Sequence, residues 1–188
     1  MPRITAGSVE QHRERIQQRI FDAFATLMAE QSFDAITMAK LAAEAGLGRT
    51  AIYHHFPSKE AVVVAFASQE TSRYIDGLRT SLAEVDSPVD RLRVYIRHQV
   101  DAGEKFHMGL GRQLYGALSA ETMGAIREHV AAIEGVLREI LDAGIAERLF
   151  VVDDMAATLS LIHACLGPRD LPADAIERFV LRALGATP

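Results

Sequence analysis

Residues 36–61 constrain the fold of this chain more than any other segment, because they read as two short helices joined by a tight turn. The hydroxyl of Thr37 can cap the first helix, whose apolar residues recur at helical spacing until Gly46. In the second helix, Ile52 and Phe56 lie four residues apart and form one buried edge. The segment therefore predicts a helix-turn-helix whose second helix turns its other side chains outward.

The outward side of that second helix is rich in hydrogen-bond donors, namely Arg49, Thr50, Tyr53, His54 and His55. Such a face suits the phosphates and base edges of DNA. We predict that Arg49 and Thr50, in the first outward turn, read bases, and that the guanidinium fork of Arg49 reads guanine. Lys59 begins a further helix, whose exposed amides and ammonium group can hold a phosphate.

The segment resembles the helix-turn-helix signature of the TetR family of bacterial transcriptional repressors over the letters LAAEAGLGRTAIYHHFPSKEAVV. The most specific part is Tyr53 followed by FPSKE at residues 56–60. The resemblance is strong over about residues 10–65 and extends to the remainder in layout only. It implies an all-α chain with a three-helix DNA-binding domain at residues 1–58 and a helical ligand-binding and dimerisation domain at residues 59–188.

The resemblance also implies contacts with the DNA phosphates or backbone, which it assigns to Thr37, Tyr53, His55 and Lys59. Two residues depart from the family pattern. Gly48 stands where a capping Ser or Thr is usual, and Ala51 stands where Thr is frequent. Each departure removes a possible phosphate contact, so either the overall affinity for DNA is lower or Arg3 or Arg13 supplies the missing contact. For Tyr53, the alternative is a ring packed on the connecting helix.

Composition and charge agree with a compact protein that meets nucleic acid locally. The chain has 188 residues, 49% of them hydrophobic, which is ample for a core, and a formal net charge of −5 that argues against general coating of nucleic acid. Basic residues of the first sixty are Arg3, Arg13, Arg15, Arg19, Lys40, Arg49 and Lys59. Acidic residues are no more numerous there, so the acidic excess belongs to the remainder.

Cysteine content and hydropathy indicate a cytoplasmic protein. The single cysteine, Cys165, excludes an intramolecular disulfide and fits a reducing compartment. The first fifteen residues have no apolar core of the kind that a secretory signal needs. The longest apolar stretch, residues 155–167, is too short to cross a membrane.

Helical periodicity continues along the rest of the chain. It predicts helices at residues 10–31, 59–78, 88–103, 108–119, 121–143, 153–166 and 173–184. Alternation typical of a strand is confined to residues 149–152, which are too few to pair convincingly. The pattern therefore agrees with an all-α fold.

The last two predicted helices carry wide apolar stripes, formed by Ala156, Leu159, Ile162, His163 and Leu166 and by Ile176, Phe179, Val180 and Ala183. One face can meet a second copy of the chain, or the stripes can simply close the core of the monomer. The resemblance implies the first: a four-helix bundle across a two-fold axis, which sets two DNA readers one groove repeat apart.

Candidate effector-binding residues are apolar, aromatic and hydrogen-bonding side chains on the predicted helices of the second domain: Phe66, Tyr74, Tyr95, His98, Phe106, His107, Met108, Arg112, Tyr115, Met123 and His163. Their mixed character suits a small, flat organic ligand, and core packing is the alternative for each. A metal-responsive site is a further alternative, with ligands from His98, His107, His163 and Cys165. Their spacing matches no compact metal motif.

Catalytic patterns are absent from the sequence. Glu104 and His107 form a single Glu-x-x-His pair, whereas di-iron bundles need two such pairs and further carboxylates. We therefore expect no enzyme and no cofactor. The resemblance implies a repressor that binds a palindromic operator as a homodimer and is released by a small organic ligand. The different-class alternative is a helical ligand-binding or scaffold protein whose helix-turn-helix only packs.

Overall fold

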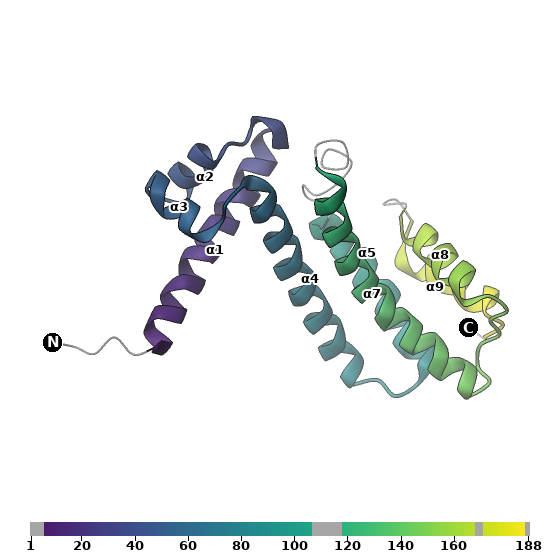
Figure 1. Cartoon of the computed structure of the whole chain (residues 1–188). Helices are drawn as coiled ribbons and strands as arrows, with labels where there is room; N and C mark the ends of the chain where they lie inside the picture. Colours follow the sequence, from purple (N-terminus) through teal and green to yellow (C-terminus); the bar gives the residue numbers. More distant parts are fainter. Residues whose placement is uncertain (1–5, 107–117, 168–170, 187–188) are drawn as a thin grey trace. The chain divides into compact units, whose positions relative to one another are not determined.

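The computed structural model describes residues 6–106, 118–167 and 171–186, and the regular elements there are helices (Figure 1). They are α1 (Ala6–Glu30), the 3-10 helix η1 (Phe33–Ala35), α2 (Met38–Glu44), α3 (Arg49–His55), α4 (Lys59–Ala83), α5 (Pro88–Phe106), α7 (Ala120–Ala146), α8 (Met155–Leu166) and α9 (Ala173–Ala183). No strand occurs among these described residues, which confirms the all-α prediction. None of the described helices is long and apolar enough to span a membrane.

Several helices run beyond their predicted ends. α4 continues to Ala83 because Leu82 prolongs the buried stripe of Tyr74 and Leu78. α5 likewise passes Gly103 and ends at Phe106. The helix predicted at residues 108–119 falls almost entirely outside the described residues.

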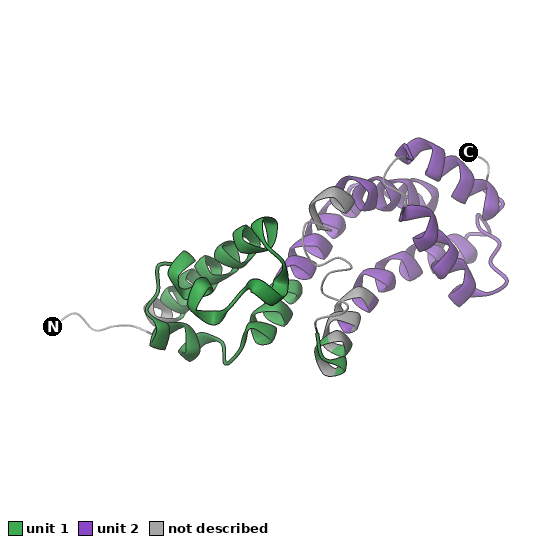
Figure 2. Cartoon of the chain, turned by 90° about the horizontal axis from the view of Figure 1, so that it is seen from above, with its two compact units in different colours: residues 1–68, 108–126 green, residues 69–107, 127–188 purple. Residues whose placement is uncertain are grey.

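Packing divides the chain into two compact units, which Figure 2 distinguishes by colour. Unit 1 comprises residues 1–68 and 108–126, and unit 2 comprises residues 69–107 and 127–188. The first turns of α4 belong to unit 1 because Val62 and Val63 are fully buried in its core. The packing boundary thus falls at residue 68, whereas the functional boundary at residue 58 stays a prediction.

Unit 1 is built around an aromatic core that α1 supplies. Phe21 and Phe24 are almost fully buried. The ring of Phe21 lies 5.7 Å from that of Phe56, which follows α3, and the ring of Phe24 lies 5.2 Å from that of Phe66 on α4. These contacts hold the helix-turn-helix to the long first helix.

The turn between α2 and α3 is fixed by a Schellman motif and an arginine clamp. Gly46 has a φ of +63°, and the amide of Leu47 donates to the carbonyl of Ala42 at 2.7 Å. Arg19 of α1 reaches across, and its Nη2 donates to the carbonyl oxygens of Ala45 at 2.6 Å and of Gly46 at 3.1 Å. The angle between the two helices is therefore set by backbone geometry that only glycine adopts readily.

Gly46→Ala is expected to lower the free energy of unfolding by about 2 kcal/mol, because alanine is strained at this φ and its Cβ would lie 2.8 Å from Nη2 of Arg19. Urea unfolding followed by circular dichroism measures the loss. Gly48→Ala is the matched control, since Gly48 has a φ of −69° and an added Cβ meets nothing within 4 Å. Equal losses from both substitutions would contradict the argument.

Unit 2 has its own core, to which α4, α5, α7, α8 and α9 all contribute. Its largest wholly buried side chain is Tyr95 of α5. α9 packs along α5, where the carboxylate of Glu177, itself only 5% exposed, accepts hydrogen bonds from Nε of Arg97 at 2.6 Å and from Nη2 at 3.2 Å. This ion pair satisfies the buried carboxylate and fixes α9 on the unit.

The segment after α7 is an ordered loop that closes on the helix end. Arg148 has a φ of 59°, and the amide of Leu149 donates to the carbonyl of Gly144 at 2.8 Å, which makes a second Schellman motif. Phe150 then folds its ring against the backbone of Gly144, and Val151 donates its amide to a carbonyl of α9's C-terminal cap. In the short apolar run at residues 149–152, Phe150 thus serves packing, Val151 is exposed, and no strand pairing occurs.

The apolar stripes of α8 and α9 divide between two roles. Leu159, Ile162, Ile176 and Val180 are buried in the core of unit 2. These four residues close the core of the monomer, which was the alternative to dimerisation. α8 and α9 pack against α5 and against each other within one chain. Phe179, in contrast, is 55% exposed.

Candidate functional site

The outward face of α3 is free for a partner. Ile52 is fully buried and Phe56 is 8% exposed, so the predicted edge anchors the helix on unit 1. Arg49, Thr50 and His54 are exposed, and Tyr53 is 46% exposed. Tyr53 is thus partly accessible at the surface, and its role on DNA stays a prediction.

Gly48 caps α3 without a side chain. Its backbone is extended, with φ −69° and ψ 150°, and no side-chain hydrogen bond caps the helix there. Gly48 stands where a capping Ser or Thr is usual. The first backbone amides of α3 therefore have no side-chain cap. Ala51 is half-buried beside them.

Thr37 is the N-cap of α2, as predicted, because its hydroxyl accepts a hydrogen bond from the amide of Lys40 at 3.2 Å. Lys40 itself is engaged with the loop before α2. Its ammonium donates to Oε1 of Gln31 at 2.7 Å and to the carbonyl of Ala35 at 2.9 Å. Thr37 remains exposed and keeps its hydroxyl proton for a phosphate.

Lys59, at the start of α4, is held by η1. Its Nζ donates to the carbonyl of Phe33 at 3.1 Å and lies 4.2 Å from the centroid of the Phe33 ring. An ammonium has three protons, so this placement leaves donors for a phosphate. The contact fixes where the charge lies relative to α3.

His55, the last residue of α3, is half-buried. Burial, followed by the charges of Arg13, His54 and His12, lowers the pKa of its imidazole below the ordinary value of 6.5. His55 is therefore neutral at pH 7 in the free protein.

The interior of unit 2 brings together four of the predicted effector residues. The hydroxyl of Tyr95 is 3.2 Å from Nε2 of His163 and accepts a hydrogen bond from Nε2 of Gln99 at 2.9 Å. The ring of Tyr74 lies 4.7 Å from that of His98. Sequence reasoning missed Gln99, although its position one helical turn after Tyr95 is the signal that places both on one face of α5.

Both buried tyrosines stay protonated. Burial raises the pKa of Tyr95 to about 12, and burial together with Tyr95 raises the pKa of Tyr74 further. This cluster (Tyr74, Tyr95, His98, Gln99 and His163) consequently offers two neutral phenol groups beside the imidazoles and the amide.

Other predicted effector residues lie elsewhere or outside the described parts. Phe66 belongs to unit 1, where its ring packs 5.2 Å from Phe24, so it is a core residue there and no member of the unit 2 cluster. The side chains of Phe106 and Met123 and all of His107, Met108, Arg112 and Tyr115 are outside the described set. Within the described residues, no group of three or more metal-ligating side chains gathers.

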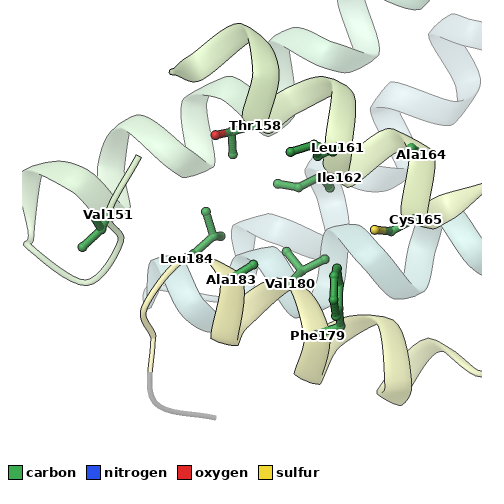
Figure 3. Close-up of a pocket in the computed structure, with 10 residues that line it drawn as sticks. All are labelled: Val151, Thr158, Leu161, Ile162, Ala164, Cys165, Phe179, Val180, Ala183 and Leu184. Carbon is green, nitrogen blue, oxygen red and sulfur yellow. The ribbon is translucent and has the colours of Figure 1, made fainter. Parts of the chain in front are cut away.

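A groove of about 370 Å³ lies between α8 and α9 (Figure 3). Its lining is apolar apart from Thr158 and Cys165, and Figure 3 shows Leu161 and Phe179 approaching it from the two helices. Leu161 is 67% exposed and Phe179 is 55% exposed. The groove therefore leaves two large apolar side chains in contact with solvent in the single chain.

Two family descriptions match this sequence, one for each part of the fold. Residues 20–66 match the bacterial regulatory proteins of the tetR family, and residues 88–177 match the tetracyclin repressor-like C-terminal domain. The chain belongs to the TetR family. The resemblance first seen in the helix-turn-helix letters is confirmed, and it extends over the C-terminal part of this TetR-family chain as well.

Individual relatives match different lengths of the chain. An uncharacterised HTH-type transcriptional regulator of Mycobacterium tuberculosis is 34% identical over 83 residues, which are 44% of this chain and 41% of that protein. The chain thus spans less than half of that relative. Nucleoid occlusion factor SlmA of Serratia proteamaculans is 28% identical over 165 residues, which are 84% of this chain and 83% of that protein.

Among solved structures, the fold is similar to that of the transcriptional regulator FadR from Bacillus subtilis in complex with stearoyl-CoA. The TM-score is 0.73 at 19% sequence identity, over 89% of this chain and 96% of that chain. At this identity the similarity shows a shared fold.

Proposed function

We propose that this TetR-family chain is a cytoplasmic, ligand-responsive transcriptional repressor with no enzymatic activity. It binds a palindromic operator as a homodimer and is released by a small organic ligand. The observation that carries the proposal is the exposed donor-rich face of α3, held on unit 1 by the buried Ile52 and Phe56. A scaffold whose helix-turn-helix only packs has no use for such a free face.

Division of labour on the DNA follows from side-chain chemistry and placement. Arg49 and Thr50, at the exposed start of α3, read base edges in the major groove. Thr37, Tyr53, His54, His55 and Lys59 hold the backbone and set the register of the helix. Lys59 suits this role because its contacts with Phe33 fix the position of its charge.

Effector binding takes place in the helical domain, where the cluster around Tyr95 offers hydrogen bonds in an apolar setting. The ligand-bound FadR structure supports a small-molecule site in this fold. α4 provides the connection, since one helix contributes Val62 and Val63 to the core of unit 1 and Leu78 and Leu82 to the core of unit 2. DNA release is a population shift, limited by the ligand's differential affinity for the two states.

The homodimer uses the exposed faces of α8 and α9. Leu161 and Phe179 stand at the groove between these helices, and each is more than half exposed in the single chain. In an isologous dimer, α8 and α9 of one copy pack against α8 and α9 of the other. Such a dimer places the two α3 helices on one face of the DNA.

The first experiment is fluorescence anisotropy of the full chain on DNA immediately upstream of its own gene, at several salt concentrations and against a shuffled competitor. Saturable, salt-sensitive binding that resists the competitor establishes a specific regulator. If binding is equal on both DNAs, selection from random sequences follows. Failure of that selection would favour the scaffold alternative.

Arg49→Ala is expected to reduce the preference for the specific site over shuffled DNA about tenfold, because a bidentate guanine contact is lost. Lys59→Ala is expected to weaken binding to all sequences alike and to lower the salt slope by about 0.9. The same anisotropy titrations measure both effects. Thermal melts of Lys59→Ala control for the lost contacts with Phe33. Equal loss of preference in both variants would refute the division of labour.

A further inference from the structure

The guanidinium of Arg19 connects α1 to the turn that precedes α3. Its Nη2 donates to the carbonyl oxygens of Ala45 at 2.6 Å and of Gly46 at 3.1 Å. We propose that Arg19 is a positioning residue for base reading. It holds the start of α3, and with it Arg49 and Thr50, in the orientation that meets base edges, and it does not itself contact the DNA. This inference rests on the proposed function and adds a residue of α1 to it.

The two carbonyl groups that Arg19 binds are ones that the turn itself leaves unpaired. The Schellman motif directs the amide of Leu47 back to the carbonyl of Ala42. Among the backbone hydrogen bonds described outside the helices, none reaches the carbonyl of Ala45 or Gly46. Both groups follow the C-terminal end of α2, where carbonyls lack helical partners and the helix dipole favours a positive charge. The guanidinium therefore supplies both the donors and the charge that this end of α2 requires.

The first residues of α3 have few other contacts that fix their orientation. Gly48 provides no side-chain cap, and Arg49 and Thr50 are exposed. The side chains that anchor α3 in the core, Ile52 and Phe56, both come later in the chain. The orientation of the base-reading residues therefore depends on the turn between α2 and α3, to which the guanidinium is bound.

Few rotatable bonds separate the arginine clamp from the base-reading residues. Gly46 has a φ of +63°, Leu47 is partly buried against the core of unit 1, and Gly48 is extended. Arg49 follows directly. A Cβ at Gly46 would lie 2.8 Å from Nη2 of Arg19, so the guanidinium lies directly on the turn. A movement of the turn is carried to Arg49, and a bidentate base contact tolerates little movement because both hydrogen bonds need the right distance and direction.

The opposite end of α2 is held by other contacts. Thr37 caps that end, and the ammonium of Lys40 donates to Oε1 of Gln31 and to the carbonyl of Ala35. α2 packs against both α1 and α3 (Figure 1). Loss of the guanidinium is therefore expected to reorient the end of α2 that leads into α3, while the rest of unit 1 keeps its core.

Positioning and a direct phosphate contact predict different salt dependences. A side chain that neutralises a phosphate contributes about 0.9 to the salt slope, whereas a positioning residue leaves the number of phosphate contacts unchanged. The matched control is Arg15, one helical turn earlier on α1. It is exposed, and its Nε donates to the carbonyl of Gln11 in its own helix. Arg19→Gln and Arg15→Gln thus remove the same charge from the same helix, and only the first releases the turn.

The test compares these two variants of the full chain by fluorescence anisotropy on the specific DNA and on shuffled DNA at several salt concentrations. We expect Arg19→Gln to reduce the preference for the specific site about tenfold and to have the salt slope of Arg15→Gln. Arg15→Gln should keep the preference of the parent chain. A loss of folded protein lowers binding to both DNAs in the same proportion, so the preference does not report it.

A further variant and a spectrum of the free chain give independent readouts. Arg19→Lys keeps the charge and a donor of shorter reach, so its preference should lie between those of the parent and Arg19→Gln. In ¹H–¹⁵N spectra without DNA, Arg19→Gln is expected to shift the amide resonances of Arg49 and Thr50. Arg15→Gln should leave both resonances in place.

Three results would overturn the inference. They are an Arg19→Gln chain with the preference of the parent, unshifted amide resonances of Arg49 and Thr50 in that variant, or a salt slope about 0.9 smaller than that of Arg15→Gln. The last would make Arg19 a phosphate contact. Each leaves the proposed repressor function intact, because the parent chain still binds its specific DNA. Absence of specific binding by the parent would instead remove the proposed function, and this inference with it.

Discussion

Phe179→Glu is expected to raise the dissociation constant of the homodimer about 100-fold. In the single chain the Phe179 ring is 55% exposed at the groove between α8 and α9, beside Leu161. A second copy would bury the ring, and aromatic residues at the centre of an interface contribute much of its binding energy. A glutamate there would bury an unpaired charge. Sedimentation velocity across a concentration series measures the change.

A control separates the groove from apolar exposure in general. Leu171, before the start of α9, is 45% exposed and does not line the groove, so Leu171→Glu should leave the dimer unchanged. In the proposed homodimer two DNA-binding helices bind the operator together, so the monomeric Phe179→Glu chain should also lose affinity for operator DNA. A stable dimer in this variant would show that another surface pairs.

Gly144→Ala is expected to lower the free energy of unfolding of unit 2 by about 3 kcal/mol. A Cβ at this position would overlap the ring of Phe150, which is 3% exposed and packs against the helix backbone. The ring must leave its site or push the loop away, and either movement loses burial and packing. Hydrogen exchange of α7 and α9 amides, together with urea unfolding, measures the loss.

Gly135→Ala on the same helix is the matched control. An added Cβ meets nothing within 4 Å there, so alanine should stabilise the helix by about 0.5–1 kcal/mol. The two substitutions have the same chemistry and opposite expected signs. Destabilisation by both would mean that close contact with Phe150 is not the cause.

Periodicity was enough to predict the described helices and the helix-turn-helix. Ile52 and Phe56 defined the buried edge of α3 from their spacing alone, and both are buried. The sequence predicts that Thr37 caps α2, and its hydroxyl accepts a hydrogen bond from the amide of Lys40. Such features depend on residues within one or two helical turns of each other, so the local sequence is enough to predict them.

Periodicity could not predict which face of a helix is buried where the helix has apolar residues on more than one side. The stripes of α8 and α9 were apolar on more than one side, and spacing did not tell which side faces its own core. Leu159 and Val180 lie in the core of unit 2, whereas Leu161, absent from the predicted stripe, is 67% exposed. For Phe66, a candidate effector residue, the spacing likewise did not reveal that its ring packs on Phe24 in unit 1; whether it meets an effector stays a prediction.

The sequence by itself determined the all-α fold, the helix-turn-helix and the family, because these follow from local spacing and from a short specific motif. Only the tertiary structure shows which residues from distant parts of the chain contact one another. It brought Gln99 and His163 to one hydroxyl of Tyr95 and set Arg19 on the turn after α2. Residues far apart in the chain meet only through the packing of whole helices, and no local pattern encodes that packing.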